Sequence, residues 1–299
     1  MIGKNVYQPS VRIGNWFEDM RLEESQVKDF LDKKKNGDLL MQKRAAVIEN
    51  ILKKVELTVV NDGLVHFGNI IQLRCAGDEV PKITGKNRQT SVLAAHCSID
   101  VMSQDAKLAH PCKVTSCRDL IPNVRSCFVI TSCDGTPNGQ PLRYTQPFYL
   151  KTTDSSGGNL FLQSDTFDFT KCAFRTRHQE VLLVPNPSYL AQWRIIYFNP
   201  LLRMEYENMP VPANIPVLIN HVYTNQNLCV EDEARLIRTV FSMDYEVSVH
   251  TYLNSHKAEE EQNHWVIVTA APGAPIVMRS SQKESIEEAQ GDNIVQQPN

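Results

Sequence analysis

The feature of this sequence that most constrains its fold is a threefold repetition of short β-rich segments. Gly, Pro, Asn and Asp separate these segments, as expected for strands joined by turns. The same succession of four segments occurs three times between residue 70 and residue 268. The first copy comprises residues 70–73, 91–94, 113–115 and 127–130; the second 148–150, 159–162, 180–183 and 193–196; the third 217–219, 227–230, 246–249 and 265–268.

The fourth segment of each copy carries an aromatic residue at or near its start. Phe128, Trp193 and Trp265 are separated by intervals of 65 and 72 residues, which suit a domain with internal three-fold symmetry. Twelve short strands in three sets of four predict a β-trefoil, in which six strands close a small barrel and six cap it as hairpins. We therefore expect a mainly β fold with the three aromatic residues in one core layer. An open β-sandwich with a similar number of strands is the rival architecture.

The first sixty residues show a different periodicity. From residue 16 to residue 55, apolar residues recur with helical spacing and charged residues fill the positions between them. Asn36-Gly37 supplies a left-handed stop, after which Asp38 can cap a second helix. This pattern predicts an α-helical hairpin with a short turn.

Three regions follow from these patterns. We expect an N-terminal arm and helical hairpin over residues 1–60 and a β-trefoil-like domain over residues 61–271. The remaining tail, residues 272–299, has little apolar content and much Gln, Glu and Ser. Such a tail is flexible in isolation, or it becomes extended along a partner.

Composition argues against several classes of protein. The 299 residues include 31 Lys and Arg against 34 Asp and Glu, a net charge of -3, so no overall positive field attracts nucleic acid. No apolar run approaches the roughly 18 residues that cross a bilayer, and the first residues lack the apolar core of a signal peptide. The chain has eight cysteines and no usable N-glycosylation acceptor. We therefore expect free thiols in the cytoplasm or another reducing compartment, with no membrane partner.

The sequence carries no recognisable catalytic pattern. The spacings of the P-loop, the nucleophile elbow, the zinc-protease helix and the dinucleotide-binding loop are all absent. Cys112, Cys117, Cys127 and Cys133 crowd into 22 residues, but four, nine and five residues lie between them. Structural zinc sites usually offer close cysteine pairs, so buried free thiols are favoured over zinc. We expect no catalytic residue, no cofactor, no metal and no small-molecule substrate.

Two long stretches of mixed composition resemble one known family. The first runs from residue 11 to residue 31 and contains Arg12-Ile13-Gly14-Asn15-Trp16. The second contains Leu202-Arg203-Met204-Glu205-Tyr206-Glu207, Pro210-Val211-Pro212-Ala213-Asn214, His250-Thr251-Tyr252-Leu253-Asn254-Ser255-His256 and Asn263-His264-Trp265. Both stretches resemble the cilia- and flagella-associated protein 161 family, in register over about residues 10–45 and 200–270.

This resemblance implies a non-enzymatic microtubule inner protein. Such a protein lies in the axoneme of motile cilia, bound to the lumenal wall of the A-tubule of doublet microtubules, where it stabilises the lattice for ciliary movement. The implied partners are α/β-tubulin and neighbouring microtubule inner proteins.

Two groups of residues are candidate partner contacts. Arg12, Asn15 and Trp16 combine an arginine with an aromatic residue near a chain terminus, a frequent hot-spot composition. The alternative is that Trp16 packs the hairpin against the β domain. In the second group, prolines stiffen an extended segment and lower the entropy cost of docking, although prolines also commonly fix the start of a strand. This group comprises Pro210, Pro212 and Asn214, together with His221, Asn225, Tyr252, His256 and His264 near the loops of the third copy.

A second class of function follows from the repeats. Trefoils often bind sugars, and Asn263-His264-Trp265 resembles the Gln-X-Trp element of ricin-type lectin repeats. The other copies read Ala191-Gln192-Trp193 and Ser126-Cys127-Phe128, so a core aromatic residue explains all three more economically. The alternative to a structural role is therefore a cytosolic ligand-binding β-trefoil module of lectin or MIR type.

Overall fold

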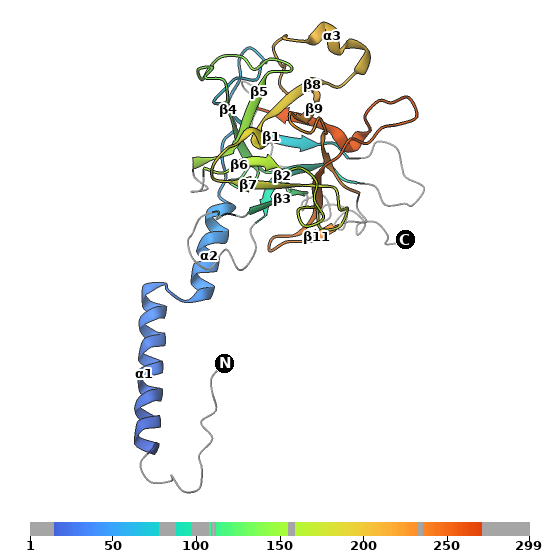
Figure 1. Ribbon diagram of the computed structural model, residues 1–299. Coiled ribbons are helices and arrows are strands. Elements are labelled where there is room, and N and C mark those ends of the chain that lie inside the picture. Colours follow the sequence, from blue (N-terminus) through green and yellow to red (C-terminus); the bar gives the residue numbers. More distant parts are fainter. Residues whose placement is uncertain are drawn as a thin grey trace, which may run out of the picture.

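The chain folds into two N-terminal helices followed by a β domain, as Figure 1 shows. The computed structural model describes residues 15–77, 88–96, 108, 110, 112–154, 159–232 and 236–270. Its helices and strands, in chain order, are α1 (Asn15–Asn36), α2 (Leu40–Ile51), β1 (Ile70–Cys75), β2 (Ser91–His96), β3 (Cys112–Cys117), β4 (Cys127–Ser132), β5 (Pro147–Thr152), β6 (Phe161–Ser164), β7 (Gln179–Val184), β8 (Trp193–Tyr197), α3 (Arg203–Tyr206), β9 (Pro216–His221), β10 (Leu228–Val230), β11 (Leu236–Arg238), β12 (Met243–Val249) and β13 (His264–Val268).

The turn between α1 and α2 has the short length that the sequence predicts. Gly37 adopts a φ of +79°, the left-handed conformation that ends a helix. Asp38 does not cap α2, because the N-cap residue is Leu39 and Asp38 forms an ion pair of 3.2 Å with Lys43. The Gln42 side chain accepts a hydrogen bond from the Leu39 N–H and donates one to a carbonyl at the end of α1.

Six strands of the β domain pair in a closed ring. β1 pairs with β4, β4 with β5, β5 with β8, β8 with β9, β9 with β13, and β13 returns to β1, always antiparallel. Each strand contributes two buried residues spaced by two, the period of side chains on one face of a strand. These residues are Ile71, Leu73, Phe128, Ile130, Phe148, Leu150, Trp193, Ile195, Val217, Ile219, Trp265 and Ile267.

The other strands form three hairpins, which also pair with one another. The hairpins are β2–β3, β6–β7 and β10–β12. Their second strands contact each other pairwise, since β3 pairs with β7, β7 with β12, and β12 with β3. All twelve predicted segments are confirmed as strands. β11, a three-residue strand beside β12, was not predicted, and β6 begins two residues late because Asn159 has a φ of +42°.

The three repeated aromatic residues lie in the core, as predicted. Phe128, Trp193 and Trp265 are all fully buried. The Trp193 indole Nε1 donates a hydrogen bond of 2.8 Å to the Leu162 carbonyl, and the Trp265 Nε1 donates one of 2.9 Å to the Leu228 carbonyl. Each indole therefore ties the last strand of a copy to the first hairpin strand of the same copy.

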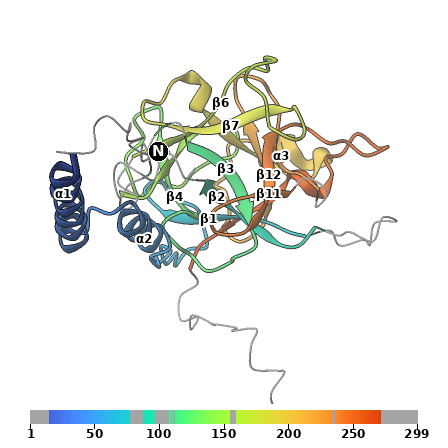
Figure 2. The same ribbon diagram turned by 90° about the horizontal axis from the view of Figure 1, so that it is seen from below.

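The two helices have different relations to the β domain. α2 packs against it through Val47 and Ile51, which are both buried, and the Ile51 carbonyl accepts a hydrogen bond from the Arg125 N–H at 3.2 Å. α1 extends away from the domain, as Figures 1 and 2 show. The expected helices are confirmed, whereas the apolar face of the first one is not buried.

Candidate partner-binding surfaces

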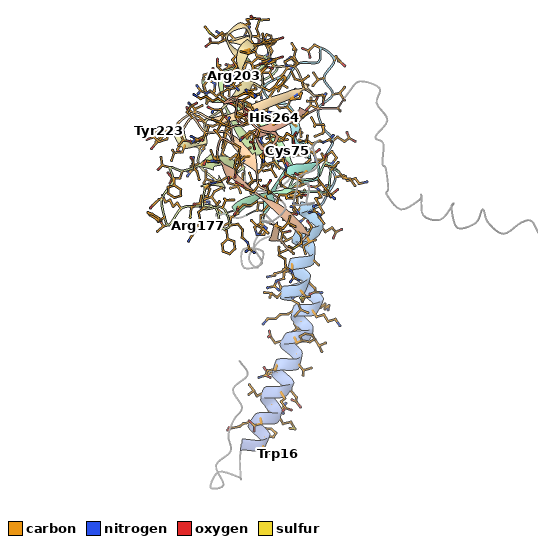
Figure 3. All side chains as sticks on the ribbon, turned by 90° about the vertical axis from the view of Figure 1, so that its right-hand side faces the viewer. Trp16, Cys75, Arg177, Arg203, Tyr223 and His264 are labelled. Atoms are coloured by element: carbon orange, nitrogen blue, oxygen red, sulfur yellow. The ribbon has the colours of Figure 1, made fainter. Side chains whose placement is uncertain are left out.

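One face of α1 carries an apolar stripe that no other described part of the chain covers. Its side chains follow helical spacing and are 39 to 64 % exposed. Figure 3 shows Trp16 at the far end of α1, so Trp16 does not pack the helix against the β domain. The stripe comprises Trp16, Met20, Val27, Phe30 and Leu31.

The polar side of α1 does not compensate for this exposure. Arg21 pairs with Glu24 at 3.1 Å and Lys33 pairs with Asp29 at 2.8 Å, but all four side chains lie in water. Exposed pairs of this kind contribute little to stability, and most of the stability of an amphipathic helix comes from tertiary packing of its apolar face. The stripe is therefore a surface that a partner would stabilise.

The proposed anchor is only partly visible. Arg12 lies outside the described residues, and so does the side chain of Asn15, whose backbone begins α1. Trp16 is 64 % exposed and is available to a partner.

A second exposed apolar group lies near α3, at the opposite end of the molecule from Trp16 (Figure 3). Leu201 is 87 % exposed and Met204 is 89 % exposed. The turn that carries them is held in place, because Arg203 donates a hydrogen bond of 2.6 Å to the Glu259 carboxylate and Tyr206 stacks on Tyr197 at 3.9 Å. Rigid backbone thus presents two flexible apolar side chains to solvent.

The segment that leads into β9 is part of the folded domain. The Val65 N–H donates to the Val211 carbonyl and the Val211 N–H donates to the Leu142 carbonyl, each at 2.9 Å. Pro210 and Pro212 are half-buried along this ladder. Asn214 is exposed, with a φ of +61°, and its side chain accepts a hydrogen bond from the Thr269 N–H at 3.3 Å. Both prolines therefore lie within the folded domain, ahead of Pro216, where β9 begins, and their role as a partner contact stays a prediction.

The polar residues of the third copy do not gather on one surface. His221 is fully buried beside Trp193, with Nε2 2.9 Å from the Leu190 carbonyl oxygen, so it is not available to a partner in this structure. Asn225 and His256 are exposed, whereas Tyr252 and His264 are half-buried. Burial also lowers the pKa values of His221 and His264.

The structure assembles a buried polar cluster around Glu231 that sequence reasoning missed. The Glu231 Oε1 atom accepts a hydrogen bond of 2.6 Å from the Ser248 hydroxyl and lies 3.1 Å from His178 Nδ1. Its Oε2 atom accepts a hydrogen bond of 2.8 Å from the Tyr252 hydroxyl, and His250 stacks on His178. Residues so far apart in the chain give no local signal, which is why the pattern of the sequence did not reveal them.

The burial of this cluster indicates a structural role. The Ser248 hydroxyl and the Cys229 thiol beside it are both fully buried, so neither group is accessible to a substrate. Burial raises the pKa of Cys229 well above its ordinary value and keeps the thiol protonated. The cluster connects the second and third copies of the repeat.

Within the described ranges, no three His, Cys, Asp or Glu side chains are placed to hold a metal ion. The clustered cysteines do not converge on one point, because the thiols of Cys112, Cys117 and Cys133 donate to the carbonyls of different residues. Within the same ranges, every helix is too short or too polar to span a membrane.

Comparison with known proteins identifies close relatives. The profile of a family described as "Cilia- and flagella-associated protein 161-like domain" matches residues 43–270. The chain is 40 % identical over 274 residues to cilia- and flagella-associated protein 161 of Danio rerio, covering 89 % of each chain. It is 39 % identical over 282 residues to the Bos taurus protein of the same name, covering 91 % of this chain and 84 % of the relative. Among solved structures, the SDF2-like protein from Arabidopsis thaliana superposes with a TM-score of 0.47 at 14 % identity, covering 69 % of this chain and 94 % of that one.

Proposed function

The chain belongs to the cilia- and flagella-associated protein 161 family, and from this premise we propose that it is a structural microtubule inner protein of motile cilia. Membership of the family makes it a cilia- and flagella-associated protein. The proposal adds that it binds the lumenal wall of the A-tubule in axonemal doublet microtubules. There it contacts α/β-tubulin and neighbouring microtubule inner proteins, stabilises the lattice and has no enzymatic activity.

The observation that carries this proposal is the uncovered apolar stripe of α1. A stripe of this length is costly in water, and a permanent assembly would cover it. Trp16 at its far end is the anchor we propose, together with Arg12 and Asn15. Leu201 and Met204 offer a second contact at the other end of the molecule. A protein with exposed apolar groups at both ends suits a position between two neighbours in a lattice.

We propose that residues 61–271 form a β-trefoil. The closed ring of six strands and the three mutually paired hairpins support this architecture, since each copy supplies two ring strands and one hairpin. A closed ring has no edge strand to recruit other chains, which suits a rigid building block. The arm and helices of residues 1–60 and the tail of residues 272–299 are the proposed docking segments. The tail and most of the arm lie outside the described residues.

Fractionation of purified motile axonemes tests the lumenal position. Membranes are removed with detergent, the axonemes are extracted with increasing salt, and each fraction is analysed by mass spectrometry for this chain. We expect the chain to remain with the salt-stripped doublets, because the tubule wall limits escape from the lumen. Release by detergent or by moderate salt would overturn the proposal.

The ligand-binding alternative has less support from the geometry. Trp193 and Trp265 are fully buried, and Asn263 is equally buried, donating a hydrogen bond of 2.7 Å to the His250 carbonyl. Two of the three residues that resemble a lectin element, Asn263 and Trp265, are therefore buried, and His264 is half-buried. Saturable binding on a glycan array, lost on substitution of loop residues near Trp265, would favour the alternative.

A further inference from the structure

A cavity of about 400 Å³ lies where the three hairpins meet. Val114 on β3, Val181 on β7 and Val247 on β12 form its apolar wall, one valine from each copy of the repeat. Phe174 and Ile237 also line it. An engineered apolar cavity of about 150 Å³ is large enough to bind benzene, so this volume is ample for a large apolar side chain.

The loop that forms one side of the cavity, residues 165–178, is held in place by a buried carboxylate. Glu246 is 2 % exposed, and its two oxygens accept hydrogen bonds from the backbone N–H groups of Arg175 (2.8 Å) and Thr176 (2.9 Å). An ion pair of 2.6 Å between Asp165 and Lys171 spans the first half of the loop. A loop fixed in this way loses little further entropy when it binds.

This anchored loop exposes three aromatic side chains. Phe167, Phe169 and Phe174 are 54, 87 and 67 % exposed, and the rings of the first two lie 6.1 Å apart. Exposed aromatic groups on a rigid support are typical binding hot spots. Phe174 lines the cavity, whereas Phe167 and Phe169 lie on the same loop outside its lining. A small molecule inside the cavity would leave the exposed phenylalanine rings in water, whereas a polypeptide segment would cover the cavity and these rings.

Three cations lie in or beside the lining of the cavity, which also contains the carboxylates of Glu180 and Glu246. Lys113, Arg175 and Arg177 are exposed, and none of them forms an ion pair within the described part of the chain. The Arg175 guanidinium lies 5.3 Å from the Phe174 ring centroid, and Arg177 donates a hydrogen bond of 3.3 Å to the Cys172 thiol. The Glu246 carboxylate is already engaged by backbone N–H groups of the loop, and burial raises the pKa of Glu180 while the charge of Lys113 lowers it. A partner with negative charge complements this rim.

We propose that this surface binds an acidic polypeptide segment of a partner protein. We call it the hairpin face and define it by Lys113, Cys172, Phe174, Arg175, Arg177 and Val181. The segment inserts one apolar side chain into the cavity and places its carboxylates against the lysine and the two arginines. Figure 3 shows Arg177 at the surface well away from Arg203, so the hairpin face is distinct from the apolar group near α3. This binding is a property of the isolated chain and does not depend on a lumenal position.

Selection of a random dodecapeptide display library on the immobilised full chain tests the proposal. We expect enriched peptides to have net negative charge and one Phe, Trp, Leu or Met flanked by acidic residues. Phe174→Ser and Arg175→Glu should each weaken their binding by about tenfold or more, as for hot-spot residues. Ile121→Ser, at a side chain that is 50 % exposed, and Lys53→Glu are the matched controls and should bind like the unsubstituted chain.

All four side chains are exposed, so none of the substitutions should lower the melting temperature. Enrichment of basic or uncharged peptides, no enrichment at all, or equal binding by Arg175→Glu would overturn the proposal.

Alkylation of Cys172 by N-ethylmaleimide locates the bound peptide. Cys172 lines the cavity and is half-buried, and Cys133, which is half-buried elsewhere, is the internal control. A selected peptide at about ten times its Kd should slow alkylation of Cys172 about tenfold and leave Cys133 unchanged, because one site is then roughly nine-tenths filled. An unchanged Cys172 rate would place the peptide elsewhere. A Cys172 that is already unreactive in the isolated chain would mean that the chain fills its own cavity. Either result would overturn the proposal.

Discussion

His178 and His250 stack with their ring centroids 4.0 Å apart and their ring planes 14° apart, and the stack joins two copies of the repeat. His178 precedes β7 in the second copy, and His250 follows β12 in the third. The pKa of His250 is lowered by burial first and by the neighbouring His178 second, while Glu231 raises it. The surroundings of His250 therefore disfavour its protonation in the folded chain.

We expect the protein to lose stability as the pH falls below about 6.5. A histidine whose pKa is lower in the folded state binds fewer protons there than in the unfolded chain, so acid favours unfolding. The stabilisation is complete above the unfolded pKa and is lost as the pH falls through the folded one. Burial acts in this direction on His96, His221, His250 and His264, whose ordinary pKa is 6.5.

Thermal unfolding followed by circular dichroism between pH 7.5 and pH 5.5 measures this effect. His250→Gln should reduce the dependence of Tm on pH, whereas the exposed His256→Gln should leave it unchanged. A Tm that rises on acidification would contradict the assignment.

The second prediction concerns a buried ion pair. Arg125 Nη2 lies 2.7 Å from Asp244 Oδ2, and the two side chains are 3 % and 0 % exposed. Arg125→Met removes the cation and leaves a buried carboxylate unpaired, which should cost about 3–5 kcal/mol of unfolding free energy. Adding Asp244→Asn should recover part of that loss, because the orphaned charge is then gone. Urea denaturation of the single and double variants gives the coupling energy, and additive losses would show that the pair is not coupled.

The two core indoles donate similar hydrogen bonds, but their acceptors differ. Trp193→Phe removes a hydrogen bond to the buried Leu162 carbonyl, and Trp265→Phe removes one to the Leu228 carbonyl, which keeps a hydrogen bond of 3.3 Å from the Asn263 side-chain amide. We expect each substitution to lower the unfolding free energy by about 1–3 kcal/mol, with the smaller loss for Trp265→Phe. Urea denaturation provides the measurement, and Tyr189→Phe, at an exposed position, is the control. An equal or larger loss for Trp265→Phe would contradict this prediction.

We expect substitutions in the apolar stripe on α1 to reduce incorporation into axonemes without lowering the stability of the isolated chain. Trp16→Ala should abolish incorporation into axonemes, while the Tm of the isolated chain should stay unchanged because this side chain is 64 % exposed. Arg12→Ala should reduce incorporation in the same way. Leu22→Ala is a matched control, since Leu22 is 50 % exposed and lies outside the stripe. Incorporation is measured with tagged variants in cells that lack the endogenous protein. A lower Tm for Trp16→Ala would indicate packing rather than an anchor.

Local patterns in the sequence were sufficient to find α1, α2 and twelve of the thirteen described strands, but not the four-residue helix α3. Alternating apolar residues bounded by turn residues mark a strand wherever it pairs, so all twelve segments could be placed in advance. The cap of α2 was placed one residue early, because the reach of the Gln42 side chain depends on how α1 ends. β11 was missed because three residues are too few to establish a period.

The candidate contacts depend on tertiary structure to a greater degree. A histidine in a sequence does not indicate whether its side chain is buried or exposed. The burial of His221 and the exposure of His256 could therefore not be distinguished until the packing around Trp193 was known. The hairpin face and the Glu231 cluster draw on residues more than fifty positions apart, which come together only after the hairpins pair.

The sequence by itself determined the type and order of α1, α2 and twelve of the thirteen described strands, their threefold repetition and the family, because these depend on local spacing and on residue identity. Only the tertiary structure decided that the ring of strands closes, that three hairpins enclose a cavity and that α1 keeps its apolar stripe in water. The closure of the ring, the enclosure of the cavity and the exposure of the stripe depend on which distant surfaces of the chain meet. An amphipathic pattern indicates that one face of a helix packs against a partner, but it does not indicate which partner.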